Sequence, residues 1–193
     1  CRKDTDEAQR FLRAPATTRD GVRVEIGLNL GSVSTQALEA SHATDFVGLL
    51  RTEFLYLEAS HMPTEEEQYT AYKKVLLEYA PRPVTVRTLD IGGDKTLPYF
   101  ELPKEENPFL GLRALRLCFA HPHLLRTQFR AALRAAAYGS LWLMLPMVSG
   151  VEDFCRAKQM LEQTRAELDA QGTGPLGDVK LGVMIETPAM VLM

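Results

Sequence analysis

The sequence predicts an α/β fold, a partial (β/α)₈ TIM barrel of about the first five βα units. Apolar strand-like segments alternate with helical segments along most of the chain, which is the pattern of right-handed βαβ connections and a parallel sheet. Polar residues follow directly on several expected strands, where barrel enzymes place their chemistry. An open doubly wound sheet is the alternative, but no G-x-G-x-x-G turn follows the first expected strand.

Five strands are predicted, over residues 22–30, 46–50, 84–89, 141–145 and 179–185. The first follows the turn dipeptide Asp20-Gly21 and alternates apolar and polar residues, as a half-buried strand does. The second is a continuous apolar run, which is typical of a strand buried on both faces. The third leads into the loop Asp90–Lys95, which contains two adjacent glycines. We expect the barrel domain to cover residues 21–193, preceded by a short helical linker over 1–20.

Helices are predicted over residues 4–13, 35–42, 63–79, 113–119, 122–138 and 151–170. The helix near Pro63 has a definite start signal, because Thr64 and Glu67 have the spacing of a capping box. The last helix is amphipathic, and its inward side is expected to carry Phe154, Met160, Leu161 and Leu168. Residues 96–107 are acidic and proline-containing without periodicity, so we expect a long loop there.

The composition is that of an ordinary globular protein. The chain has 193 residues, 46% of them hydrophobic, and a net charge of -3, which argues against non-specific binding of nucleic acid. The apolar run Leu141–Val148 is too short to cross a membrane. Three widely spaced cysteines without a C-x-x-C pair indicate neither a disulfide framework nor a zinc site, so a cytoplasmic location is expected. The chain begins with a cysteine rather than methionine, and we expect a piece of a longer protein.

Two arginines stand at the ends of consecutive predicted strands, Arg51 and Arg87. An unpaired buried guanidinium is costly, so each needs an acidic partner or an anionic ligand. Equivalent ends of adjacent parallel strands lie about 5 Å apart, and two arginines there repel each other unless an anion lies between them. Guanidinium groups bind phosphate oxygens in pairs, which predicts a phosphate site. An ion pair between Arg51 and Glu53 or another loop acid remains the alternative.

Two further residues are candidates for the same edge of the sheet. Arg113 opens the next helix and is either a third anion-binding group or a solvated helix residue. Glu186 ends the fifth strand, and a carboxylate there suits Mg²⁺, which prefers oxygen ligands. The alternative for Glu186 is an ion pair with Arg51 or Arg87. Backbone amides near Gly92-Gly93, together with Lys95, could also face an anion.

Six segments in this order resemble enzyme I of the bacterial sugar phosphotransferase system: Gly48–Tyr56, Pro63–Gln68, Arg87–Lys95, Glu105–Gly111, Leu145–Met147 and Met184–Pro188. The resemblance covers about residues 20–193. It implies a truncated C-terminal barrel domain that binds phosphoenolpyruvate and Mg²⁺ and forms a homodimer. A phosphoryl group would pass from phosphoenolpyruvate to a histidine on a separate N-terminal domain, and then to the carrier HPr during sugar uptake.

The same resemblance implies the roles of the site residues. Arg51 and Arg87 would grip the phosphate of phosphoenolpyruvate with Arg113 close by, and Glu186 would be one of two carboxylate ligands of Mg²⁺. The acceptor histidine, the second metal ligand and a proton-donating cysteine would lie outside this chain, so the segment alone is expected to be inactive. The alternatives are the barrel of a pyruvate phosphate dikinase or phosphoenolpyruvate synthase, and a non-catalytic module that senses phosphoenolpyruvate or dimerises.

Overall fold

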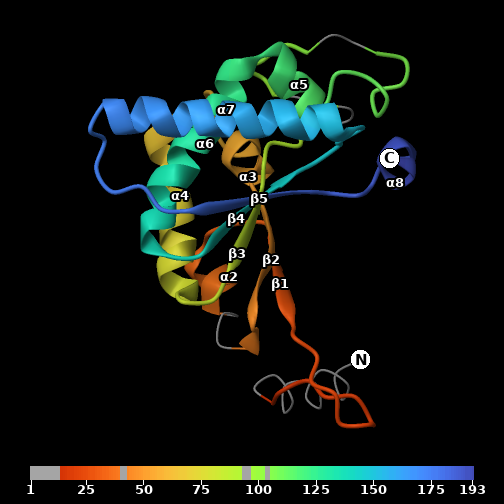
Figure 1. Cartoon of the computed structure of the whole chain (residues 1–193), viewed down its shortest axis with the longest axis vertical. Coiled ribbons are helices and arrows are strands. Elements are labelled where there is room, and N and C mark those ends of the chain that lie inside the picture. The colour runs from red at the N-terminus through yellow and green to blue at the C-terminus, as the bar shows by residue number, and fades with distance from the viewer. Residues whose placement is uncertain (1–13, 40–42, 93–96, 103–104) are drawn as a thin grey trace.

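The computed structural model describes residues 14–39, 43–92, 97–102 and 105–193 (Figure 1). Its strands are β1 Gly27–Leu30, β2 Phe46–Arg51, β3 Val84–Arg87, β4 Leu141–Leu145 and β5 Val179–Val183. Its helices are α2 Thr35–Glu39, α3 Glu53–Leu57, α4 Glu65–Tyr79, α5 Ala114–Ala120, α6 Pro122–Ala135, the 3₁₀ helix η2 Ala136–Tyr138, α7 Val151–Ala170 and α8 Pro188–Leu192. The helix expected over 4–13 lies outside the described residues, as do Gly93 and Lys95.

The strands form one parallel sheet in the order β1-β2-β3-β4-β5, so each strand pairs with the next one along the chain. This confirms the α/β class and the parallel sheet. A doubly wound sheet reverses its strand order at a switch point, whereas a barrel adds its strands in sequence. The observed order contains no reversal among the described strands and is consistent with part of a barrel.

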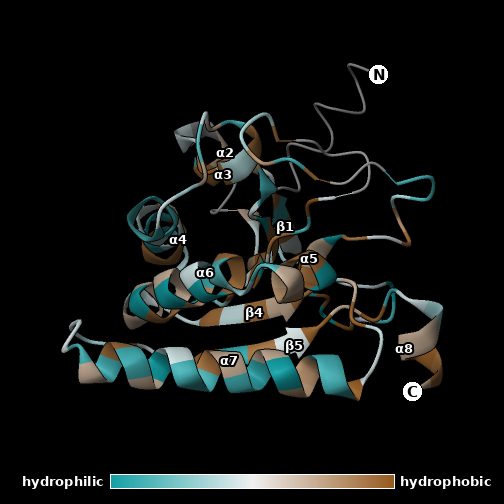
Figure 2. Ribbon diagram, turned by 90° about the horizontal axis from the view of Figure 1, so that it is seen from above, coloured by the Kyte–Doolittle hydropathy of each residue, from teal (hydrophilic) through white to brown (hydrophobic). Residues whose placement is uncertain are grey.

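The two faces of this sheet have different surroundings. On β4, Leu141, Leu143 and Leu145 are buried in the main core, together with the apolar residues of α4 and α6. In Figure 2, α6 runs lengthwise next to β4, and α4 is seen nearly end-on beside it. The alternate residue Trp142 is 38% exposed on the other face, where the Lys180 ammonium lies 4.7 Å from its ring centroid. One face is therefore packed under helices while the opposite face remains accessible.

Local sequence signals account for the best predicted elements. The α4 capping box is present: Thr64 Oγ1 accepts a hydrogen bond from the Glu67 amide, and the Glu67 carboxylate accepts one from the Thr64 amide. Helix α7 and strand β4 have the predicted bounds. Within α7, Leu161 and Leu168 are buried as expected, whereas Phe154 and Met160 are only partly buried.

Some predicted boundaries are wrong. The first strand begins at Gly27 rather than residue 22. The segment before it does not join the sheet: Arg23 forms an isolated antiparallel bridge with Thr17, and Val22 and Val24 are 58% and 43% exposed. Strands β3 and β5 each end two residues earlier than predicted, at Arg87 and Val183. The short helices α3 and α8 were not predicted from the sequence; each forms only a little over one turn, too short for a periodic pattern.

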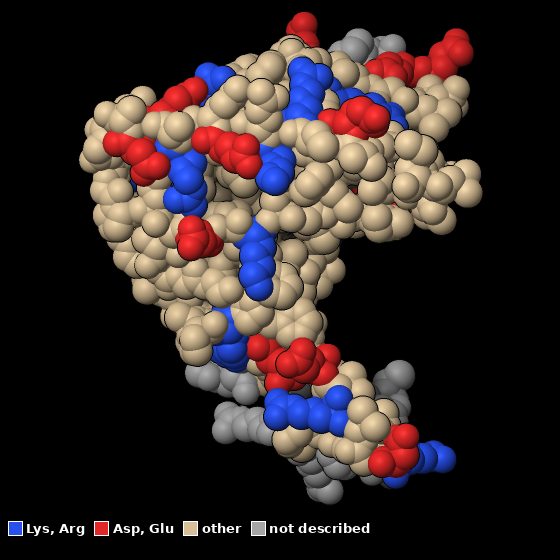
Figure 3. Space-filling view, in the orientation of Figure 1, with Lys and Arg blue, Asp and Glu red and all other residues tan. Residues whose placement is uncertain are grey.

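The surface carries charges of both signs. On the face in Figure 3, acidic and basic side chains are interspersed, as expected for a chain with 22 basic and 25 acidic residues. Within the described ranges, no helix combines the length and the apolar character needed to cross a membrane.

Candidate functional site

The predicted arginines occupy equivalent positions on adjacent strands. Arg51 ends β2 and Arg87 ends β3, and these two residues are register partners in the parallel ladder. The sequence-based placement of both at the carboxyl edge of the sheet is therefore confirmed. Their surroundings differ, because Arg87 is 9% exposed whereas Arg51 is exposed.

Arg87 is held by two acidic side chains. Its Nη2 donates to the carboxylate of Glu53, and its Nη1 lies 3.4 Å from Oδ2 of Asp90. Its buried Nε has no hydrogen-bond partner among the described residues. A buried guanidinium needs compensating negative charge, and these two carboxylates supply it. One donor of Arg87 is nevertheless left without an acceptor.

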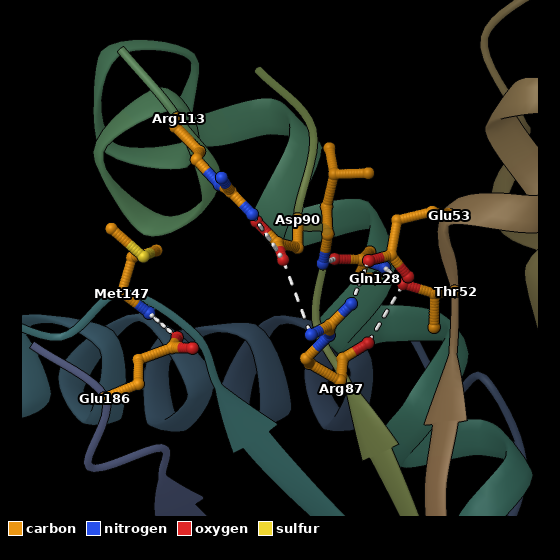
Figure 4. A network of polar contacts seen from close by, with 9 residues as sticks. Thr52, Glu53, Arg87, Asp90, Arg113, Gln128, Met147 and Glu186 are labelled. Atoms are coloured by element: carbon orange, nitrogen blue, oxygen red, sulfur yellow. Dashed lines mark hydrogen bonds and ion pairs between the residues drawn. The ribbon is translucent and has the colours of Figure 1, made fainter. Parts of the chain in front are cut away.

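Arg113 belongs to the same cluster. Its Nε and Nη2 lie 2.8 Å and 3.1 Å from the two carboxylate oxygens of Asp90, a bidentate pair. Asp90 thus bridges Arg87 and Arg113 (Figure 4). The alternative of a solvated helix residue is wrong, because the Arg113 side chain is only 14% exposed.

Two loops must approach closely to bring Arg113 to Asp90. Gly92 has a φ of 115°, and a Cβ there would lie 2.6 Å from the carbonyl oxygen of Leu112. The Ala114 amide donates to the carbonyl of Ile91 at 2.9 Å, joining the two loops directly. Only glycine permits both this backbone conformation and this contact. The Gly-Gly pair noted in the sequence therefore has a structural role at its first glycine.

Arg51 lines an open cavity of about 270 Å³. The lining residues are Gly31, Arg51, Glu53, Phe54, Leu57 and Glu58. Gly31 makes room for the arginine, since a Cβ there would lie 2.6 Å from Nη2 of Arg51. The proposed alternative, an ion pair between Arg51 and Glu53, is not what the structure shows: Glu53 pairs with Arg87 instead. Of the three candidate arginines, Arg51 is the exposed one, whereas Arg87 and Arg113 are enclosed.

Glu186 lies three residues beyond the end of β5 and is exposed. Its Oε1 accepts a hydrogen bond of 2.7 Å from the amide of Met147, a residue in the loop after β4 with a φ of 57°. This backbone contact orients the carboxylate at the same edge as Arg113 (Figure 4). The described residues contain no group of three or more metal-ligating side chains, so Glu186 stands there as a single candidate ligand.

The two cysteines among the described residues differ in exposure. Cys118 is buried in α5, and burial raises the pKa of its thiol to about 12. It is therefore protonated at neutral pH and unsuited to attack a substrate. Cys155 is a free thiol on α7. Neither contributes to the arginine cluster.

Sequence reasoning missed the acids that hold the arginines. Glu53 lies two residues after Arg51 in the sequence and was considered only as a partner of Arg51. Helix α3 begins at Glu53, and the side chain pairs with Arg87. Thr52 was also missed; it is buried and donates to the carbonyl of Arg87 at 2.9 Å. The Arg-Thr-Glu run was the available signal, but its partners lie on another strand and could not be read from spacing.

Comparison with known proteins agrees with the chemistry of this edge. The family model described as "PEP-utilising enzyme, PEP-binding domain" matches residues 5–193. The phosphoenolpyruvate-protein phosphotransferases of Listeria innocua and Listeria monocytogenes are 48% and 51% identical over 187 residues, or 97% of this chain. That of Staphylococcus carnosus is 47% identical over 187 residues. The chain spans about a third of the length of these relatives, 33% in each case. A match along nearly its whole length shows that this chain belongs to the phosphoenolpyruvate-utilising enzymes and falls within their phosphoenolpyruvate-binding domain.

Proposed function

We propose that the chain is the phosphoenolpyruvate-binding part of a longer phosphoenolpyruvate–protein phosphotransferase. In that protein the phosphoryl group moves from phosphoenolpyruvate to a histidine on another domain and then to HPr during sugar uptake. The proposal extends to this chain the activity named in its relatives, and the arginine cluster is the observation that carries it.

The guanidinium groups at this edge favour an anionic ligand. Glu53 and Asp90 pair with Arg87 and Arg113. Arg51 pairs with neither of these carboxylates and lines the open cavity, whose lining also includes Glu58. Arg51 supplies the accessible guanidinium, and Arg87 has a donor without an acceptor. Phosphate oxygens satisfy both features because guanidinium groups bind them through paired hydrogen bonds.

Glu186 suits a magnesium ion that the bound phosphate would share. Its exposed carboxylate has Oε1 fixed by the Met147 amide, which leaves the group oriented for a hard cation. Mg²⁺ commonly takes one or two carboxylates, together with substrate oxygens and water. When bound, the ion would neutralise phosphate charge. We place the second carboxylate ligand outside this chain.

The chain's own residues would bind and orient the phosphate. Arg51 and Arg87 would hold phosphate oxygens in the direction that exposes phosphorus to an incoming histidine, and Arg113 would fix Asp90 behind them. Their fixed positive charges stabilise the transferring group without reorganisation at the moment of reaction. The same proposal includes a closed barrel with residues 21–193 as its first part and 1–20 as a linker. It also includes a homodimer and a cytoplasmic location.

Phosphoryl transfer in the full-length protein tests this function. Incubation with phosphoenolpyruvate and Mg²⁺ is expected to release pyruvate and to leave an acid-labile phosphohistidine, without any requirement for ATP. A requirement for ATP would instead indicate a dikinase or synthase, and binding without phosphoprotein would indicate a sensing module. Either result would contradict the proposal.

The metal role of Glu186 is tested in the same assay. Glu186→Ala is expected to shift the Mg²⁺ concentration for half-maximal transfer upward by on the order of tenfold or more, because one carboxylate ligand is lost. Glu162→Ala, which removes an exposed carboxylate on α7, is the matched control and should leave the titration unchanged. An unchanged titration for Glu186→Ala would assign that residue a structural role only.

A further inference from the structure

Gln128 is a polar side chain in an otherwise apolar helix interface. It lies in the middle of α6, is 1% exposed, and is surrounded in the chain by buried residues such as Leu125, Phe129 and Ala132. A buried amide is costly unless it is hydrogen-bonded, so its presence here calls for partners.

The partners of Gln128 lie at the ends of two strands. Its Oε1 accepts from the amide of Leu89 at 2.8 Å, and its Nε2 donates to Oγ1 of Thr52 at 3.3 Å. The hydroxyl of Thr52 in turn donates to the carbonyl of Arg87 at 2.9 Å. Gln128 therefore reaches the residue just before Asp90 directly and Arg87 through one hydroxyl (Figure 4).

These contacts replace missing strand pairing. The β3 ladder ends near Arg87, with the Thr88 amide still bonded to the Met144 carbonyl at 3.0 Å. Leu89 follows beyond the ladder, and its amide is paired with the Gln128 side chain. Without that acceptor, the backbone leading into Asp90 would lose the contact that fixes its direction.

The Gln128 amide has a third partner within the helix layer, Tyr72. Nε2 also donates to the hydroxyl of Tyr72 at 3.3 Å, and that hydroxyl donates to Oε1 of Gln68 at 3.1 Å. Burial holds the pKa of Tyr72 well above its ordinary value, so the phenol stays protonated and keeps this direction of donation. The orientation itself follows from the two strand-end contacts: the Leu89 amide requires the acceptor Oε1, and the Thr52 hydroxyl, which donates its proton to Arg87, can only accept from Nε2.

We propose that Gln128 is a positioning residue for the phosphate site: it ties helix α6 to the ends of β2 and β3 and so holds Arg87 and Asp90 in place. The inference rests on the proposed function, because it assigns Gln128 a role in the grip on phosphoenolpyruvate. Displacement of a binding group by about 1 Å can reduce a reaction rate on the order of 100-fold, so a remote side chain can have a large effect.

Gln68 supplies a matched control. It is also 1% exposed and also glutamine, but it bonds to the Pro63 carbonyl at 3.1 Å and to Tyr72 within its own helix, and not to a strand end. Gln68→Leu and Gln128→Leu therefore both remove a buried amide. Only the second removes a contact to the Arg87–Asp90 segment.

The test measures KM for phosphoenolpyruvate and Tm of the full-length protein for both variants. Gln128→Leu is expected to raise KM by on the order of tenfold or more, whereas Gln68→Leu lowers Tm comparably and leaves KM within about twofold. Equal effects of the two variants on KM would overturn the proposal and leave Gln128 a structural residue.

A second variant tests the proposal even if Gln128→Leu does not fold. Thr52→Val keeps the side-chain shape but removes the hydroxyl between Gln128 and Arg87. It is expected to raise KM in the same direction by a smaller factor, and an unchanged KM would contradict the proposal. The wild-type protein separates the two hypotheses: absence of transfer in the wild type refutes the proposed function, whereas the variants test only the role of Gln128.

Discussion

Arg51 and Arg87 are the same residue type at paired strand positions, yet they have different tasks in the folded chain. Arg87 is enclosed by Glu53 and Asp90, so it contributes to the structure as well as to charge at the site. Arg51 lies against Gly31 at the mouth of a cavity. A substitution at Arg87 is therefore expected to change both stability and ligand binding, whereas one at Arg51 is expected to change binding alone.

We predict that Arg87→Ala destabilises the full-length protein by about 3–5 kcal/mol, because it removes a buried cation that pairs with the carboxylates of Glu53 and Asp90. Arg51→Ala is expected to change the free energy of unfolding by less than about 0.5 kcal/mol, as for other exposed residues. Urea denaturation measures both values. Glu53→Gln in the Arg87→Ala background should recover part of the loss, and equal stability of the two single arginine variants would contradict the structural role of Arg87.

The positions of the site residues could be predicted from the sequence, but their pairing could not. A polar residue directly after an apolar strand places Arg51, Arg87 and Glu186 at one sheet edge, because parallel strands end at the same edge. Which acid pairs with which arginine depends on the direction in which α3 leaves β2. That direction is set by packing between residues far apart in the chain, as is the contact of Gln128 with Leu89.

At the scale of elements, helices α4 and α6 are joined by an ion-pair network at their exposed side. Glu65 in the first turn of α4 bonds to Arg130 at 2.5 Å and to Arg134 at 2.7 Å. Arg134 also bonds to Glu66 at 2.7 Å. Burial raises the pKa of Glu65, but the hydrogen bonds from the two arginines outweigh it, and its pKa lies below the ordinary value of 4.5.

This network gives a prediction about pH. A carboxyl group with a lowered pKa in the folded state adds stability above its unfolded pKa and loses it as pH falls through the folded pKa. Glu65→Gln is therefore expected to cost about 1 kcal/mol at neutral pH, with the difference from wild type vanishing as pH falls below 4.5. Urea denaturation between neutral pH and pH values below 4.5 measures this difference. The control variant Glu162→Gln is expected to leave the free energy of unfolding unchanged. A pH-independent difference would show that the network is not electrostatic.

Helices α4 and α7 show which secondary structure can be predicted from sequence. The start of α4 follows from the local capping box, and α7 follows from a long amphipathic pattern. The first strand was predicted too long because residues 22–26 do not join the five-stranded sheet, and Arg23 instead forms an isolated antiparallel bridge with Thr17. Local pattern thus identifies an element, whereas its length depends on neighbours that the pattern does not contain.

The whole sheet has one accessible face and two open edges. Within the described residues, β1 pairs only with β2 and β5 only with β4. The accessible face carries Trp142, the single tryptophan of the sequence. In a closed barrel this face is the interior, and the open edges pair with the remaining strands.

We therefore predict that the 193-residue chain on its own self-associates through its edges. Light scattering should show oligomers, and acrylamide should quench the fluorescence of Trp142. In the full-length protein, the Trp142 fluorescence is the difference between the signals of wild type and Trp142→Phe. Acrylamide should quench this fluorescence much less than in the isolated chain. A monodisperse monomer, together with equal quenching in both contexts, would contradict a barrel interior on this face.

Calorimetric titration of phosphoenolpyruvate into the full-length protein tests the central claim most directly, that the arginine edge binds its phosphate. We expect binding that strengthens with Mg²⁺ and that weakens on the order of 30-fold or more in Arg51→Ala, since a charge-assisted contact is lost while the fold is retained. Arg126→Ala, which removes an exposed arginine from α6, controls for net charge and should bind like wild type. Wild-type affinity in Arg51→Ala would contradict the account.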